Sequence, residues 1–149
     1  MNQTEIFSAI ESKQPQMLAF LEKLVNIDSA KDSIEGIHEV ATHIKNKLEE
    51  IGFDEVKLIE TPGAPTHVFG HKAAKDPSAK KVMIMGHMDT VFPKGTVAQR
   101  PFTIKENKAF GPGVLDMKSG ITIGLFTMET LLESGWQDKD VTIFFCGDE

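Results

Sequence analysis

Hydrophobic residues recur every three or four positions over the first fifty residues, which predicts amphipathic helices. The opening stretch divides at Pro15, because proline fits the first turn of a helix but not its interior. A further helix is expected to begin after Asp32 or Ser33 and to end at Gly52. The apolar stripe of that helix comprises Ile37, Val40, Ala41, Ile44, Leu48 and Ile51. This stripe is expected to face the protein core.

Beyond residue 55 the hydrophobic pattern changes to that of short strands and turns. Val56, Leu58 and the stretch 66–71 alternate like short strands, and TIKENKAF predicts a hairpin. The runs KVMIMGH and DVTIFFCG are apolar throughout, which is typical of strands buried on both faces. Between them lies a helix whose expected buried face comprises Ile121, Leu125, Met128, Leu131 and Leu132. This order predicts an α/β fold with a mostly parallel mixed sheet covered by helices.

The composition excludes several classes of protein. The chain has 149 residues, 40% hydrophobic and 26% charged, which suits one globular domain. No apolar run approaches the ~20 residues of a membrane span, and the N-terminus lacks the features of a signal peptide, so a cytoplasmic protein with no membrane partner is expected. The net charge of −6 and the lack of a basic stripe argue against a nucleic-acid partner. The single cysteine, Cys146, excludes an internal disulfide and a cysteine-rich zinc knuckle.

Residues capable of chemistry follow both apolar strands. The first strand leads into His87-Met88-Asp89, and the second leads into Glu149. Because ligands bind at the carboxyl ends of strands in open parallel sheets, these side chains should face one crevice if the two strands are parallel. Asp116 comes just before the connecting helix, whose start would lie at the same edge. A histidine can bind a metal through one ring nitrogen while a carboxylate holds the other.

Each of these residues has an ordinary structural interpretation when taken alone. His87 could be a hydrogen-bonded strand-end residue, Asp116 could cap a helix that begins at Met117, and Glu149 could be a solvated carboxylate. Gly111, Gly113 and Gly120 raise phosphate binding as a rival. Their spacing matches neither the dinucleotide-binding nor the P-loop pattern, and the aspartate among them would repel a phosphate. The combination of one histidine with three carboxylates therefore favours a metal site.

The motifs MGHMDTVFPKGT, RPF, GPGVLDMKSG and a strand ending in GDE, in this order, resemble the N-terminal half of the catalytic domain of the M20 metallopeptidases, in their glutamate carboxypeptidase-like branch. The resemblance implies two divalent metal ions, zinc above all, with cobalt or manganese as alternatives. By the family pattern His87 binds one metal, Asp89 orients it, and Asp116 bridges both metals and precedes a cis peptide. Glu149 corresponds to the general base.

The implied reaction is hydrolysis of an amide bond next to a C-terminal amino acid, in a small peptide substrate. Glu149 would take a proton from a metal-bridging water, which attacks the carbonyl, and would deliver it to the leaving amine. An N-acyl amino-acid deacylase of the same family is an alternative, because it also cleaves an amide beside a carboxylate. A non-catalytic α/β binding module remains a third hypothesis.

The resemblance also implies that residues 1–149 are the N-terminal portion of a longer dinuclear-metal hydrolase. The family's second glutamate, a further acidic ligand, a late histidine ligand and a lid domain that mediates homodimerisation would belong to that parent chain. Of the expected metal ligands the sequence holds His87 and Asp116, so the fragment alone is expected to be inactive. An apolar sheet surface and an open strand edge are expected to be exposed.

Overall fold

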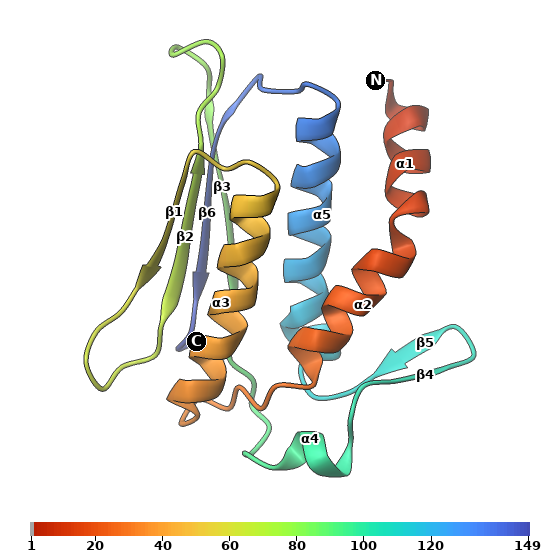
Figure 1. The fold of residues 1–149 in the computed structure, drawn as a ribbon, viewed down its shortest axis with the longest axis vertical. Coiled ribbons are helices and arrows are strands. Elements are labelled where there is room, and N and C mark those ends of the chain that lie inside the picture. Colours follow the sequence, from red (N-terminus) through yellow and green to blue (C-terminus); the bar gives the residue numbers. More distant parts are fainter. Residues whose placement is uncertain (1) are drawn as a thin grey trace.

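The computed structural model describes residues 2–149, which form a four-stranded sheet with helices packed against one face. Figure 1 shows α3 and α5 side by side over the sheet, with α1 and α2 beside α5. The helices are α1 (Gln3–Ser12), α2 (Gln14–Val25), α3 (Ile34–Glu50), α4 (Thr96–Gln99) and α5 (Ser119–Glu133). The strands are β1 (Glu55–Ile59), β2 (His67–Lys72), β3 (Lys81–His87), β4 (Thr103–Lys105), β5 (Lys108–Phe110) and β6 (Asp140–Cys146).

The helical part of the chain follows the sequence pattern closely. Pro15 occupies the first turn of α2, as its fixed backbone angle favours, and α3 has Ser33 as its N-cap residue. Gly52 follows α3 with φ at 86°, a left-handed conformation that glycine adopts without steric cost. The predicted helices are therefore confirmed, including the division at Pro15.

The main sheet has the strand order β1-β2-β6-β3. Among the described strands, β3 and β6 form the parallel pair, in which Lys81 lies opposite Asp140 and His87 opposite Cys146. β2 pairs antiparallel with both β1 and β6. The β4–β5 hairpin forms a separate two-stranded sheet that projects away from the main body in Figure 1. The α/β class and the mixed sheet are confirmed. The main sheet is not mostly parallel, because one of its three described pairings is parallel and two are antiparallel.

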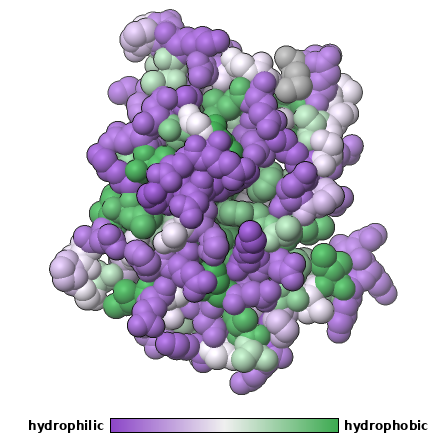
Figure 2. Space-filling model, in the orientation of Figure 1, coloured by the Kyte–Doolittle hydropathy of each residue, from purple (hydrophilic) through white to green (hydrophobic). Residues whose placement is uncertain are grey.

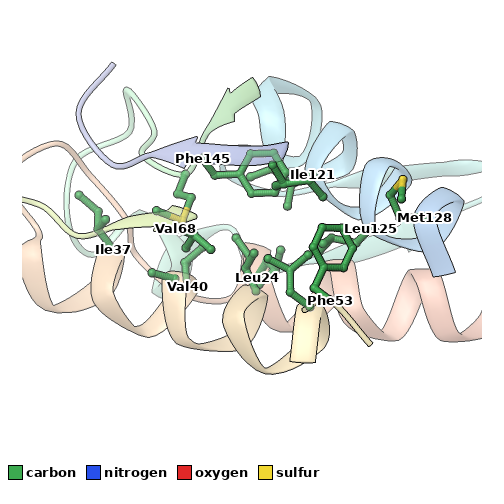
Figure 3. Packing of buried hydrophobic residues seen from close by; sticks show 14 of the residues in the cluster. Leu24, Ile37, Val40, Phe53, Val68, Ile121, Leu125, Met128 and Phe145 are labelled. Carbon is green, nitrogen blue, oxygen red and sulfur yellow. The ribbon is translucent and has the colours of Figure 1, made fainter. Parts of the chain in front are cut away.

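The core lies between this sheet and the helices. In Figure 3, Val68 and Phe145 from the sheet face Val40 of α3 and Ile121 of α5, and Leu24 of α2 joins the same cluster. All five side chains are at most 1% exposed. Figure 2 shows that the outer surface of the helical face is mainly hydrophilic, with smaller hydrophobic groups between the charged side chains. The amphipathic helices thus cover one side of the sheet and present polar residues to solvent.

The prediction that β3 and β6 are buried on both faces is wrong for the described chain. In β6 buried residues alternate with half-buried ones. β3 lies at the edge of the sheet, and helices cover a single face of it. Val82, Met83 and Met85 are 42%, 55% and 65% exposed. An apolar sequence alone does not tell whether other elements cover both faces of a strand, because that depends on distant parts of the chain. The exposed apolar strand edge expected from the sequence is present.

In the described residues, 2–149, no helix combines the length and the apolar character needed to cross a membrane.

Candidate active site

The parallel pairing of β3 and β6 brings the two sets of strand-end residues together. His87 ends β3 and lies opposite Cys146, the last residue of β6. The backbone N–H of Met88 donates to the carbonyl of Cys146 at 2.8 Å, so the backbones of the two strands remain paired one residue beyond β3. The N–H of Glu149 then donates to Oδ1 of Asp89 at 3.1 Å. The sequence expectation that His87, Asp89 and Glu149 lie at one edge is therefore met in the structure.

Asp116 reaches the same edge through an irregular turn, Val114–Lys118, that precedes α5. A cis peptide joins Asp116 and Met117, as the family resemblance implied. The side chain of Met117 packs on Gly86 of β3, where an added Cβ would lie 2.8 Å from its methyl carbon. Asp116 is not the cap of a helix beginning at Met117, because α5 begins at Ser119 and the backbone of Asp116 is extended, with φ −121° and ψ 98°. The turn instead presents the carboxylate to β3.

His87 and Asp116 form the centre of the site. Nε2 of His87 lies 3.1 Å from Oδ1 of Asp116, and the histidine side chain is 13% exposed. On the other side of the ring, Nδ1 lies 3.0 Å from the main-chain oxygen of Asp89. Because a carbonyl oxygen accepts hydrogen bonds and cannot donate them, Nδ1 carries a proton. In the neutral ring the free electron pair is therefore on Nε2, the atom that faces Asp116.

The surroundings of His87 act on its pKa in two directions. Burial disfavours the charged ring and lowers the pKa. The hydrogen bonds to the Asp116 carboxylate and to the main chain of Asp89, together with the charges of both carboxylates, raise it by more. The net effect is a pKa above the ordinary value for histidine. The site therefore attracts positive charge at the position between His87 and Asp116.

Asp89 lies behind this pair. The residue is 6% exposed, and its Oδ1 is 3.5 Å from Nδ1 of His87. The same oxygen accepts the N–H of Glu149. Asp89 thus connects the histidine to the backbone of the proposed base. In front of these residues is a hollow of about 310 Å³, lined by His87, Asp89, Phe92, Leu115, Asp116 and Glu149 among others.

The donor set suits a divalent metal ion. An imidazole nitrogen with a free electron pair and a carboxylate oxygen are ligands that zinc, cobalt and manganese accept. Within residues 2–149, no group of three or more His, Cys, Asp or Glu side chains is arranged to hold an ion. His87 and Asp116 therefore fit as part of a metal site, and two ligands are fewer than the roughly three protein ligands of a catalytic zinc.

Lys118, a residue not predicted from the sequence as part of the site, supports the turn that carries Asp116. The residue is 1% exposed, and its Nζ donates to the carbonyls of Leu24 at 2.7 Å and Ile27 at 2.9 Å. Burial lowers the pKa of Lys118 to about 8, partly opposed by the charge of Asp28. A sequence signal existed: Lys118 lies three residues before Ile121, so it extends the apolar stripe of α5 backward with a charged residue.

The sequence is similar to those of known proteins. Residues 83–149 match the sequence model of peptidase family M20/M25/M40. Carboxypeptidase G2 from Pseudomonas sp. (strain RS-16) is 35% identical over 148 residues, which are 97% of this chain and 35% of the relative. Succinyl-diaminopimelate desuccinylase from Corynebacterium glutamicum is 30% identical over 94 residues, 60% of this chain and 24% of the relative.

The fold has a counterpart among solved structures. Human carnosine dipeptidase 1 superposes with a TM-score of 0.83 and 17% identity, over 97% of this chain and 34% of that protein. At this identity the likeness concerns the fold alone. The chain spans about a third or less of the length of these relatives.

Proposed function

We propose, from the premise that this chain belongs to peptidase family M20/M25/M40, that residues 1–149 are the N-terminal portion of the catalytic domain of a divalent-metal hydrolase. The proposed reaction is hydrolysis of an amide bond next to a C-terminal amino acid. The observation that carries the proposal is the 3.1 Å separation of His87 Nε2 and Asp116 Oδ1, in one hollow with Asp89 and Glu149.

His87 and Asp116 are the proposed metal ligands, with zinc as the proposed ion and cobalt or manganese as alternatives. When bound, such ions acidify a water molecule and polarise the carbonyl of the scissile bond. The contact between Nδ1 and the main-chain oxygen of Asp89 holds the ring so that Nε2 faces the ligand position. The buried Asp89 carboxylate places negative charge near Nδ1 of the ring, which makes Nε2 a stronger electron-pair donor to a metal ion.

Glu149 is the proposed general base. Its carboxylate would accept a proton from the attacking water and pass it to the leaving amine, a role that suits a carboxylate beside a hollow. Two contacts support the assignment: Glu149 lines the same hollow as Asp116, and its backbone N–H is held by Asp89. Asp89 would thus hold both the histidine ligand and the backbone of the base.

The remaining metal ligands are proposed to come from a longer protein, together with a lid domain that mediates dimerisation. The support is the short span of this chain against its relatives and the number of ligands that it holds. Two ligands bind an ion weakly and place no second ion firmly. Residues 1–149 alone are therefore proposed to be inactive.

The substrate class has two candidates. A small peptide cleaved at its C-terminal residue is the first, because the relative that matches nearly the whole chain is named a carboxypeptidase. An N-acyl amino acid is the second, because another relative is named a desuccinylase. Both substrates present an amide beside a carboxylate, so one catalytic centre suits either.

The test begins with the coding sequence beyond the codon for Glu149. The proposal expects an in-frame glutamate, a later acidic ligand and a later histidine. The longer protein should hydrolyse N-terminally free dipeptides or N-acyl amino acids when supplied with Zn²⁺, Co²⁺ or Mn²⁺, and a chelator should abolish the activity. Absence of hydrolysis with all three metals, or activity that survives chelation, would contradict it and favour a non-catalytic binding module.

A further inference from the structure

One short segment contacts both halves of the proposed metal site. Residues 24–30, here called the support segment, comprise the end of α2 and the residues after it. On one side, the segment accepts both hydrogen bonds of the Lys118 ammonium, through the carbonyls of Leu24 and Ile27. Lys118 lies two residues beyond Asp116 and ends the irregular turn. These bonds therefore anchor the backbone that presents the Asp116 carboxylate.

On the other side, the support segment holds the backbone that follows β3. The hydroxyl of Ser29 donates to the carbonyl of Met88 at 2.9 Å, and the N–H of Thr90 donates to the carbonyl of Ser29 at 2.8 Å. Met88 directly follows His87, and Thr90 directly follows Asp89. The two hydrogen bonds therefore hold the backbone on both sides of Asp89. Ser29 is 1% exposed, which shields the hydrogen bonds from competing water.

The support segment is itself fixed in the fold. Its first residue, Leu24, is fully buried in the core. The carbonyl of Asp28 packs against Gly36 of α3 so closely that an added Cβ would lie 1.9 Å from the oxygen. The Asp28 carboxylate accepts the N–H groups of Gly95 and Val97 at 2.8 and 3.1 Å. A segment restrained in this way can hold two other parts of the backbone in fixed positions: the turn that ends at Lys118 and the residues that follow β3.

The choice of a lysine at position 118 has a physical cost. Its ammonium is buried, and neither of its hydrogen-bond partners is a carboxylate. Burial of a charge costs free energy, and an apolar side chain of similar length would fill the space without that cost. The hydrogen bonds that the ammonium donates offset this cost, and they tie the turn that carries Asp116 to residues 24–27. The carbonyl of Leu24 lies in the last turn of α2, where the helix dipole is negative and favours a cation, and that of Ile27 lies two residues beyond the helix.

We propose that the support segment sets the separation between His87 and Asp116, with Lys118 and Ser29 as positioning residues. Lys118 fixes the turn that carries Asp116, and Ser29 fixes the backbone next to His87. Neither side chain touches the proposed ligand position. The importance of this separation for metal binding rests on the proposed function, whereas the separation itself is a property of the metal-free chain.

The first test uses the metal-free chain and NMR of the His87 ring nitrogens. Lys118→Met removes both hydrogen bonds while keeping an unbranched side chain. The matched control is Lys47→Met, which removes an 8% exposed lysine whose ammonium contacts Glu129 and Glu50, away from the site. We expect the Nε2 resonance of His87 to move in Lys118→Met and to stay at its wild-type position in Lys47→Met. An unchanged resonance in Lys118→Met would overturn the proposal.

The second test measures Co²⁺ binding by visible absorption. Loss of a residue that orients a metal ligand typically weakens binding by about 10–100-fold, and we expect a loss in this range for Lys118→Met. Lys47→Met should bind within about twofold of wild type. Equal affinities for the two variants would overturn the positioning role. Because two ligands alone bind an ion weakly, this titration uses the longer protein. If the wild-type longer protein binds no Co²⁺, the proposed metal function fails, and the ring-nitrogen resonances still decide whether Lys118 sets the separation.

A milder pair of variants covers the case in which Lys118→Met does not fold. Ser29→Ala removes one hydroxyl and its bond to Met88. Its control, Ser134→Ala, removes a comparable bond to the carbonyl of Leu131 at the end of α5. We expect the His87 resonances to shift in Ser29→Ala alone. Identical His87 spectra in the two serine variants would overturn the proposal.

Discussion

The imidazole of His87 and the carboxylate of Asp116 lie 3.1 Å apart, although 29 positions separate them in the sequence. β3 supplies the first and the turn before α5 supplies the second. The Nδ1 proton of His87 is held by a main-chain carbonyl, so either a proton or a metal ion can occupy the Nε2 position. A metal ion at this position competes with a proton, because a ligand imidazole must be deprotonated.

Removal of the Asp89 carboxylate should weaken metal binding without removing a ligand. Asp89→Ala leaves the main-chain bond to Nδ1 but deletes the charge 3.5 Å behind it. We expect about 10–100-fold lower affinity for Zn²⁺, measured by competition with a chromophoric chelator. Asp32→Ala, which removes an exposed carboxylate from a neighbouring hollow, is the control and should change affinity little. Equal affinities for the two variants would exclude an orienting role for Asp89.

Substitution of the proposed base should separate metal binding from turnover. In the longer protein, Glu149→Gln keeps the backbone N–H that Asp89 holds but cannot accept a proton. We expect wild-type metal content by elemental analysis and a kcat lower by roughly 10²–10⁴-fold. Near-wild-type turnover in the variant would mean that another group is the base.

The turn that carries Asp116 should not tolerate a side chain at Gly113. This residue has φ at 71°, and an added Cβ would lie 2.5 Å from the Thr90 methyl carbon. Gly113→Ala should lower the free energy of unfolding by about 2–4 kcal/mol, from backbone strain and overpacking together. Gly135→Ala is the control, since its φ is 79° but nothing lies within 4 Å of the added carbon. It should cost about 1–2 kcal/mol. Equal losses in chemical denaturation would show that the contact with Thr90 is unimportant.

An ion-pair network joins Lys13, between α1 and α2, to α3 and α5, and it should make stability depend on pH. Glu129 lies 2.8 Å from Lys13 and 2.6 Å from Lys47. Burial raises the pKa of Glu129, but the hydrogen bonds and charges of the two lysines lower it by more, below its ordinary value of 4.5. A carboxylate with a lowered folded-state pKa stabilises the fold above pH 4.5 and loses this contribution as the pH falls further.

Glu129→Gln should therefore be less stable than wild type by about 1–3 kcal/mol at pH 7. The difference in the free energy of unfolding should shrink as the pH falls from about 5 toward the folded-state pKa and below it. Urea denaturation at a series of pH values measures this difference. A difference that stays constant across the range would show that Glu129 is not stabilised as a carboxylate.

The sequence predicted the helices, the α/β class and the edge at which the site residues gather. These features depend on local periodicity and on the rule that parallel strands end at one edge. Two features depend on distant pairing, and the local pattern does not encode them. The exposure of β3 depends on its place at the sheet edge. The extended backbone of Asp116 depends on the packing of the Met117 side chain against Gly86.

The role of Lys118 in holding the turn that carries Asp116 was also not predicted from the sequence, because it too depends on distant contacts. Lys118 is charged, and the periodic pattern identified apolar residues alone as members of the core. Its partners are main-chain carbonyls 91 and 94 positions away, which carry no side-chain signature. A charged residue that extends an apolar helical stripe is the signal that would find such a support in other sequences.

The most direct measurement is a Co²⁺ titration of the longer protein at pH 7.5, followed by visible absorption, with His87→Gln and Asp116→Asn alongside. His43→Gln, a variant on α3 away from the site, is the control. The account predicts saturable binding by the wild type and the control, and binding weaker by at least about 100-fold in both variants, because each variant loses a metal ligand. Binding by the wild type should also weaken toward pH 6, as protons compete for Nε2. Equal binding by all four proteins, or none by the wild type, would contradict the assignment of His87 and Asp116 as metal ligands.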